Sequence, residues 1–336
     1  MNFSKILTVA TLLALAAGPA SAQKVIKFAT LAPEGSTWMK VLSELNAELQ
    51  TASGGKLKFK IYAGGVSGDE KDVVKKMRIG QLHAAGFTGV GIGEIAPRLR
   101  ILDAPWLFNS AAEVDAVHQK FDKELIGALS DAGYVLLGWT DLGSVLVFSK
   151  TPFKGPEDMK KAKMWVWEGD PIAEAAYKAI GVSPVPLSIV DVLASLQTGL
   201  IDAVYGPPMG VIALQWHSRT KHIYSVPMAE ASGAVLLSKK FYDTLAPEEQ
   251  KVLTEVSAKH LKRLLELTRK ENGQALDTLV KKQGLVLSEK PTAQTLELYR
   301  KLGAQARKEL AGRLYPVDLL TRIEKFLEEY RAKKRP

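Results

Sequence analysis

The pattern of hydrophobic and polar positions predicts strands that alternate with helices in the first third of the chain. Runs of β-branched and apolar residues have the length and composition of strands, and they lie at residues 25–30, 57–62 and 82–87. Polar caps precede segments with apolar residues at helical spacing, and these helices are predicted to begin at Ser36 or Thr37 and at Asp69–Glu70. The loop before the first helix, which contains Glu34, is expected to lie at a cleft.

The same alternation continues in the middle of the chain. A short strand at 163–167, rich in β-branched and aromatic residues, precedes a helix that Asp170 caps and Gly181 ends. A second helix opens in capping-box style at Ser188 and leads into a strand at 201–205. Strand–helix–strand units of this length indicate a mainly parallel sheet, and ligands bind at the carboxyl ends of such strands.

Two segments differ from this alternation. Helical signals continue from residue 247 to about 284, which is long for one helix of a compact domain, and Gly273 inside it marks either a bend or a tolerated defect. The glycine-rich segment 86–93 lacks the GxGxxG spacing of a dinucleotide loop, so we expect it to give a ligand access to the backbone. A further amphipathic helix is predicted at 314–330.

Composition and the first residues indicate an exported, soluble protein. The 336-residue chain is 46% hydrophobic and 24% charged, as expected for a globular protein long enough to bury two cores. Lys5, an apolar run at 6–17 and small residues at 20–22 predict a cleavable signal peptide over residues 1–22. Because the chain has no cysteine, a lipoprotein anchor and disulfides are excluded, and we expect a periplasmic protein.

Charge and side-chain chemistry argue against nucleic acid binding and catalysis. The formal net charge of +9, or +8 without Lys5, is spread along the predicted helices, and export argues against a nucleic acid partner. The basic run at 331–335 is interpreted as a solvated tail, with contact to an anionic membrane as the alternative. No GxSxG elbow occurs, and the spacing of five between His217 and His222 does not suit a metal pair. We therefore predict no enzyme activity, no cofactor and no metal.

Six motifs follow one another along the chain. They are FATLAPEGSTWMKVLSELNAEL at 28–49, IYAGGVSGDEKDVVKKMRIGQLHAA at 61–85, LRILDAPWLF at 99–108, DMK at 158–160, GVSPVP at 181–186 and LQTGLID at 196–202. In this order they resemble the solute-binding proteins of TRAP (tripartite ATP-independent periplasmic) transporters, of the DctP-like family. The resemblance covers nearly all of residues 24–290. It implies an α/β, two-lobed periplasmic binding protein fold with parallel-type sheets, crossover strands and a long helix that spans both lobes.

The chain departs from the family pattern at positions that the resemblance associates with ligand binding. Trp165 falls where the family usually carries an arginine that pairs with the ligand carboxylate. Tyr205 and Gly206 replace a glutamate and an asparagine, Ile189 replaces an aromatic residue, and Val145 falls near a second basic position. An indole in place of a guanidinium removes a positive charge and five donors, so we expect a ligand more apolar or aromatic than the usual carboxylate.

The candidate ligand site combines the first loop, the end of the third strand and the second lobe. Its residues are Glu34, Trp38, Thr88, Gly89, Trp165, Trp167, Ile189, Tyr205, Gly206 and Trp216. Core packing is the alternative for Trp165 and Trp167, because large aromatic residues that share one face of a strand are common in cores. Another arginine could also replace the missing one, and the candidates are Arg78, Arg98, Arg100 and Arg219.

The resemblance implies a binding subunit that closes on its ligand and docks on a membrane permease. We expect one lobe at residues 23–142 plus about 232–272, and the other at about 143–231 plus 273–336. The expected partners are a small organic acid or apolar molecule and the TRAP permease subunits. The alternative is a periplasmic carrier of hydrophobic cargo that works with a helical-repeat protein.

Overall fold

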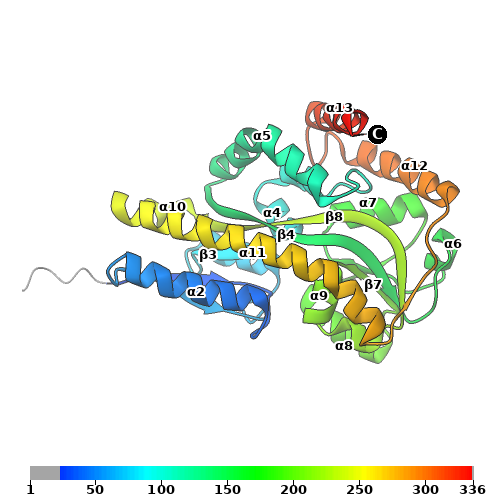
Figure 1. Ribbon diagram of the computed structural model, residues 1–336, viewed down its shortest axis with the longest axis horizontal. Helices are drawn as coiled ribbons and strands as arrows, with labels where there is room; N and C mark the ends of the chain where they lie inside the picture. The colour runs from blue at the N-terminus through cyan, green and yellow to red at the C-terminus, as the bar shows by residue number, and fades with distance from the viewer. Residues whose placement is uncertain (1–22, 335–336) are drawn as a thin grey trace, which may run out of the picture.

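The computed structural model describes residues 23–334, which form an α/β protein with two lobes (Figure 1). The predicted signal peptide at residues 1–22 lies outside the described residues. The strands are β1 Lys24–Ala29, β2 Leu57–Tyr62, β3 Ala84–Thr88, β4 Tyr134–Ser149, β5 Trp165–Trp167, β6 Val185–Leu187, β7 Ala203–Gly206, β8 His222–Ser238 and β9 Val286–Leu287. One sheet has the order β2-β1-β3-β8-β4-β7, with β9 beside β8, and β5 and β6 form another.

The first lobe is built on β1, which has parallel neighbours β2 and β3. The helices α2 (Thr37–Ala52) and α11 (Pro247–Lys281) pack their apolar residues on one face of this sheet. The other face is covered by α3 (Glu70–Arg78), α4 (Gly89–Ile95), α5 (Ala111–Asp131) and the 3₁₀ helix η1 (Pro97–Asp103). Ser36 and Asp69 cap α2 and α3 through their side-chain oxygens, so both predicted helix starts are confirmed.

Two long strands, β4 and β8, cross between the lobes (Figure 1). β8 pairs with β3 in the first lobe, β4 pairs with β7 in the second, and both pairings are antiparallel, as is the long pairing of β4 with β8. The expectation of mainly parallel sheets is therefore wrong for this part of the fold, which is mixed. The physical reason is that one crossover strand carries the chain into the second lobe and the other returns it.

The second lobe contains β5, β6 and β7 with short helices around them. These are α6 Pro156–Met159, α7 Pro171–Ile180, α8 Val192–Thr198 and α9 Pro208–Ala213, with the 3₁₀ helices η2 Ile189–Asp191 and η3 Trp216–Arg219. The carboxylate of Asp170 caps α7, and Gly181 ends it with a φ of 84°, a left-handed conformation that glycine adopts without steric cost. This helix therefore begins and ends as predicted.

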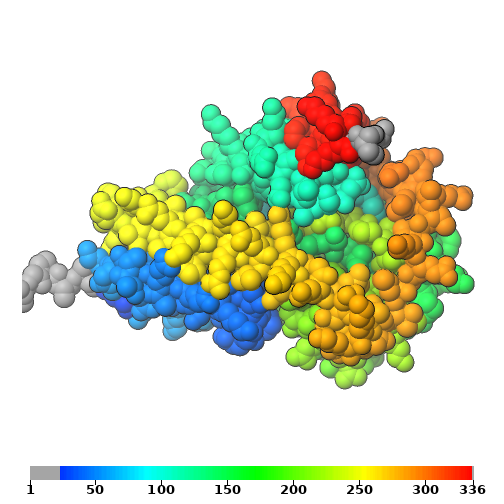
Figure 2. Space-filling view, viewed as in Figure 1, coloured from blue at the N-terminus to red at the C-terminus, as the bar shows by residue number. Residues whose placement is uncertain are grey.

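The long helix α11 joins the two lobes from outside. It contacts α2 in the first lobe and α9 in the second, and Figure 2 shows it lying across both. Gly273 does not interrupt it. The remaining helices are α10 Lys239–Tyr242, α12 Ala293–Leu310, which packs on α7, and α13 Val317–Lys333, which packs on α5. No helix in residues 23–334 combines the length and apolar character that a membrane span requires.

Candidate functional site

A cavity of about 250 Å³ lies between the two lobes. Its lining includes nine of the ten predicted site residues, which are Trp38, Thr88, Gly89, Trp165, Trp167, Ile189, Tyr205, Gly206 and Trp216. Glu34 is the exception, because it is exposed in the first loop and is not part of the lining. The fold thus brings together residues from both lobes, whereas their role in ligand binding stays a prediction.

Trp165 forms the centre of an aromatic wall in the second lobe. Its ring stacks on Tyr205, with centroids 4.9 Å apart, and meets Trp216 edge to face at 5.2 Å. The indole nitrogen donates a hydrogen bond to the carbonyl oxygen of Leu187 at 3.0 Å. Trp165 is only 1% exposed. Trp165 therefore packs in the core of the second lobe and also forms part of the cavity wall. Core packing and a place in the candidate ligand site, the two interpretations from the sequence, are both compatible with this position.

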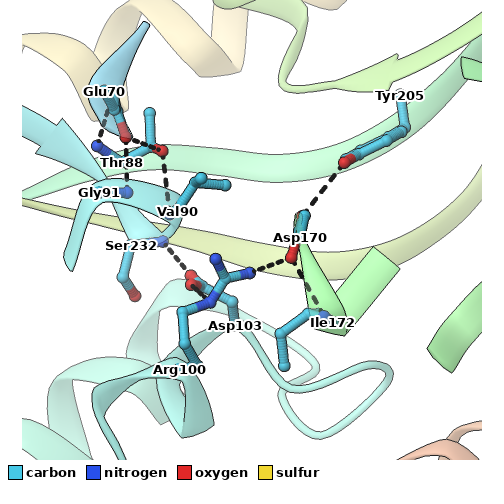
Figure 3. A network of polar contacts seen from close by, with 10 residues as sticks. All are labelled: Glu70, Thr88, Val90, Gly91, Arg100, Asp103, Asp170, Ile172, Tyr205 and Ser232. Carbon is cyan, nitrogen blue, oxygen red and sulfur yellow. Dashed lines mark hydrogen bonds and ion pairs between the residues drawn. The ribbon is translucent and has the colours of Figure 1, made fainter. Parts of the chain in front are cut away.

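Arg100 is the basic side chain that reaches the cavity lining, and it is 3% exposed. Its Nη2 lies 2.7 Å from Oδ1 of Asp170, which comes from the opposite lobe, and its Nε lies 3.3 Å from Oδ2 of Asp103 (Figure 3). Burial raises the pKa of Asp103 to about 6, although Arg100 acts to lower it. Of the four candidate replacements for the missing arginine, Arg100 alone lines the cavity, and it is already paired.

Glu70 occupies the backbone donors of the glycine-rich segment. Its carboxylate accepts hydrogen bonds from the backbone nitrogens of Thr88 and Gly91, at 2.8 and 2.7 Å, and from the Thr88 hydroxyl at 2.9 Å (Figure 3). The prediction that this segment offers its backbone to a ligand is therefore wrong for these donors. The glycines instead allow close packing, since a Cβ on Gly89 would lie 1.7 Å from the Asp103 carboxylate.

Asp69 joins the two lobes through a single carboxylate oxygen. Its Oδ2 accepts hydrogen bonds from the indole nitrogen of Trp167 at 2.9 Å, the hydroxyl of Ser188 at 2.6 Å and the backbone nitrogen of Ile189 at 3.2 Å. The predicted capping role of Ser188 is wrong, because its side chain makes no cap hydrogen bond and binds the opposite lobe instead. Local sequence patterns do not reveal such a contact, since the two residues are far apart in the chain.

Further acids line the cavity from the crossover strands and α11. Asp141 pairs with Arg269 at 2.8 Å, Glu230 accepts a hydrogen bond from the Ser144 hydroxyl at 2.6 Å, and Glu271 accepts one from Thr37. Burial raises the pKa of Glu230. Sequence analysis missed these residues because single acids on a long helix or strand are indistinguishable from a solvated surface. Their presence makes the lining rich in carboxylates.

Comparison with known proteins identifies the family of this chain. Residues 28–310 match the family model described as "Bacterial extracellular solute-binding protein, family 7", or DctP. A solute-binding protein of Verminephrobacter eiseniae is 26% identical over 71% of each chain. The C4-dicarboxylate-binding periplasmic protein of Rhodobacter capsulatus is 23% identical over 91% of this chain and 92% of its own.

A solved structure supports the fold. The sugar acid binding protein of Advenella mimigardefordensis, in complex with galactonate, superposes with a TM-score of 0.84 at 18% identity, covering 92% of this chain and 99% of its own. This likeness confirms the two-lobed periplasmic binding protein fold with crossover strands and a long helix. Because the family model spans most of the chain, the protein belongs to the DctP family of TRAP periplasmic solute-binding proteins.

Proposed function

We propose that the protein binds a small, uncharged and largely apolar or aromatic molecule in the cavity between its lobes. The main observation in support of this proposal is that Arg100 is already paired with carboxylates of the protein itself. Among the described residues that line the cavity, Arg100 is the single basic side chain, and it already faces the carboxylates of Asp103 and Asp170. A ligand carboxylate would have to compete with both of these groups for the guanidinium.

The charge of the lining also disfavours an anion. Six carboxylic side chains contribute to it, namely Glu70, Asp103, Asp141, Asp170, Glu230 and Glu271. Those that are ionised repel an anion, whereas Glu70, whose pKa burial raises to about 7, carries its charge only in part at neutral pH. Two like charges 4 Å apart repel by about 4 kcal/mol at an effective dielectric constant of 20. A carboxylate that leaves water without a partner loses several kcal/mol more. An uncharged ligand avoids both costs.

The shape and chemistry of the cavity suit an aromatic or compact apolar molecule. Four of the six tryptophans of the chain line it, together with Tyr205. Aromatic rings supply large apolar area and favour stacked or edge-to-face contacts. An apolar cavity of about 150 Å³ holds benzene, so a volume of about 250 Å³ suits a ligand of roughly ten non-hydrogen atoms.

This ligand class differs from what the names of the compared relatives state. The Rhodobacter protein is described as binding C4-dicarboxylates and the Advenella protein as binding a sugar acid. We propose that Trp165 stands in the position where such relatives carry the arginine for the ligand carboxylate. The buried indole, stacked on Tyr205 and in edge-to-face contact with Trp216, supports this proposal because it gives this part of the wall an apolar surface and no positive charge for a ligand carboxylate.

As a binding subunit, the protein would deliver its ligand to the membrane permease of a TRAP transporter after hinge closure. We place the first lobe at residues 23–142 plus about 232–272, and the second at about 143–231 plus 273–336. Residues 1–22 would be removed as a signal peptide on export to the periplasm. The same aromatic-walled cavity would also serve a carrier of hydrophobic cargo that works with a helical-repeat partner. A permease gene pair next to the gene of this protein would favour the transporter subunit over the carrier.

The test is to identify the molecule that co-purifies with the protein from a periplasm. Native mass spectrometry measures the mass of the complex, and denaturation releases the ligand for identification. We expect an uncharged molecule with an aromatic or apolar body. In calorimetry on the ligand-free protein, benzamide should then bind at least tenfold more tightly than benzoate, which has the same shape and a negative charge.

Galactonate serves as the comparison for a sugar acid. Release of an organic acid, or tighter binding of benzoate or galactonate than of benzamide, would show that Arg100 or another group still accepts a carboxylate. Either result would overturn the proposal and return the protein to the ligand class of its compared relatives.

A further inference from the structure

We infer that Asp103 and Asp170 determine the charge of the ligand, because they neutralise the arginine that would otherwise bind a carboxylate in this cavity. This inference rests on the proposed function. The two aspartates come from different lobes and meet at Arg100.

The position of Arg100 makes it a potential anion site. It lies in η1, directly after α4, and its aliphatic carbons pack over Gly93, where a Cβ would lie 2.6 Å from Arg100 Cδ. The missing side chain of Gly93 thus makes room for the arginine to lie along α4. Its guanidinium lies in the cavity lining and between the lobes (Figure 3).

Asp103 is held beside this guanidinium by the first lobe. It follows Arg100 by three residues in η1, and its Oδ1 accepts a hydrogen bond from the backbone nitrogen of Ser232 at 2.9 Å. Its other oxygen lies 3.3 Å from Arg100 Nε and packs against Gly89, where a Cβ would lie 1.7 Å away from it. Asp103 is therefore fixed before the second lobe approaches.

Asp170 brings the second carboxylate from the opposite lobe. Its Oδ1 contacts Arg100 Nη2 at 2.7 Å and accepts a hydrogen bond from the backbone nitrogen of Ile172 at 3.1 Å. Its Oδ2 accepts one from the Tyr205 hydroxyl at 3.1 Å. Tyr205 in turn stacks on Trp165, so the aromatic wall positions the counter-ion of the arginine.

The three side chains carry one positive and two negative charges, a net charge of −1 when all are ionised. An arriving carboxylate would add a third negative charge around one guanidinium, which already lies beside one carboxylate of each lobe. Replacing both aspartates by asparagine would leave a net charge of +1. Asparagine is an isostere that still accepts the backbone hydrogen bonds of Ser232 and Ile172.

The experiment measures benzoate and benzamide binding by calorimetry for the wild type and for the double variant Asp103→Asn/Asp170→Asn. We expect the double variant to bind benzoate at least tenfold more tightly than the wild type does, with a gain that falls as salt is added. Circular dichroism and thermal unfolding check that the variant is folded. The single variant Asp170→Asn, which keeps the helix cap, should show a smaller gain if the double variant does not fold.

Two further variants identify the cause of the gain. Glu324→Gln also removes a carboxylate that is paired with an arginine, Arg307 at 2.9 Å, but it lies outside the cavity lining, so it should leave benzoate binding close to the wild-type value. Adding Arg100→Met to the double variant should abolish the gain.

Benzoate binding no tighter in the double variant than in the wild type, including no binding in either, would overturn this inference. An equal gain in Glu324→Gln, or a gain that survives Arg100→Met, would also overturn it. A wild-type preference for benzoate over benzamide is a different result, because it contradicts the proposed function itself.

Discussion

Glu70 in the cavity wall accepts three hydrogen bonds, and its ionised form is still unfavourable because the carboxyl group is buried. Burial raises the pKa of its carboxyl group to about 7, from an ordinary value of 4.5, although the donors of Thr88 and Gly91 lower it. The folded protein therefore holds a proton on this group over a pH range in which the unfolded chain has lost it.

This difference predicts a loss of stability with rising pH. Between about pH 4.5 and pH 7 the folded state binds more protons than the unfolded state, so the contribution of Glu70 to the free energy of unfolding decreases, by up to about 3 kcal/mol. Urea unfolding of the wild type and of Glu70→Gln at pH 5 and pH 8 measures this contribution. The wild type should lose stability relative to the variant at pH 8. A difference between the two proteins that is independent of pH would contradict the raised pKa.

For single residues, the sequence predicted which aromatic side chains line the cavity, but it did not predict which charged side chains pair with one another there. Trp165, Trp167 and Tyr205 could be predicted from a strand pattern and a family resemblance. The partners of Arg100 could not, because Asp170 lies 70 residues away and approaches only when the lobes are packed together. Periodicity describes neighbours along one element, and pairing across a cleft depends on the tertiary fold.

At the scale of elements, helix starts and ends were predictable wherever a single residue fixes the backbone. Ser36, Asp69 and Asp170 cap their helices, and Gly181 adopts the left-handed conformation that ends one. The glycine-rich segment was misjudged, because glycines required for packing against Asp103 and Arg100 have the same appearance in a sequence as glycines that expose the backbone.

Gly273 provides a test of the long helix. It lies inside α11, and a Cβ at this position would meet no atom within 4 Å. Gly273→Ala should therefore raise the free energy of unfolding by about 0.5–1 kcal/mol, because alanine loses less conformational freedom in a helix. Gly91→Ala is the contrasting variant, since its Cβ would lie 2.2 Å from the Phe87 ring, and it should destabilise by about 1–3 kcal/mol. A destabilised Gly273→Ala would show that the helix bends there in solution.

At the scale of the whole molecule, the two lobes are held together by contacts that involve no ligand. The Asp69 carboxylate binds three donors of the second lobe, and Arg100 binds Asp170. In a two-lobed protein, groups that touch only after closure stabilise the closed form. Because these contacts already favour the closed form, an uncharged ligand can accompany closure without forming ion pairs to both lobes.

Asp69→Asn should shift this protein toward an open form. The amide presents one acceptor where the carboxylate has two, so it cannot cap α3 and accept from Trp167, Ser188 and Ile189 together. Charge-assisted hydrogen bonds contribute about 1.5–3 kcal/mol, so the variant should bind its ligand roughly tenfold more weakly. Small-angle X-ray scattering without ligand should give a larger radius of gyration for the Asp69→Asn variant than for the wild type.

The neighbouring Asp72→Asn, which only loses a surface pair with Lys75, should match the wild type in both measurements. Equal scattering and affinity for all three proteins would show that Asp69 does not hold the lobes together.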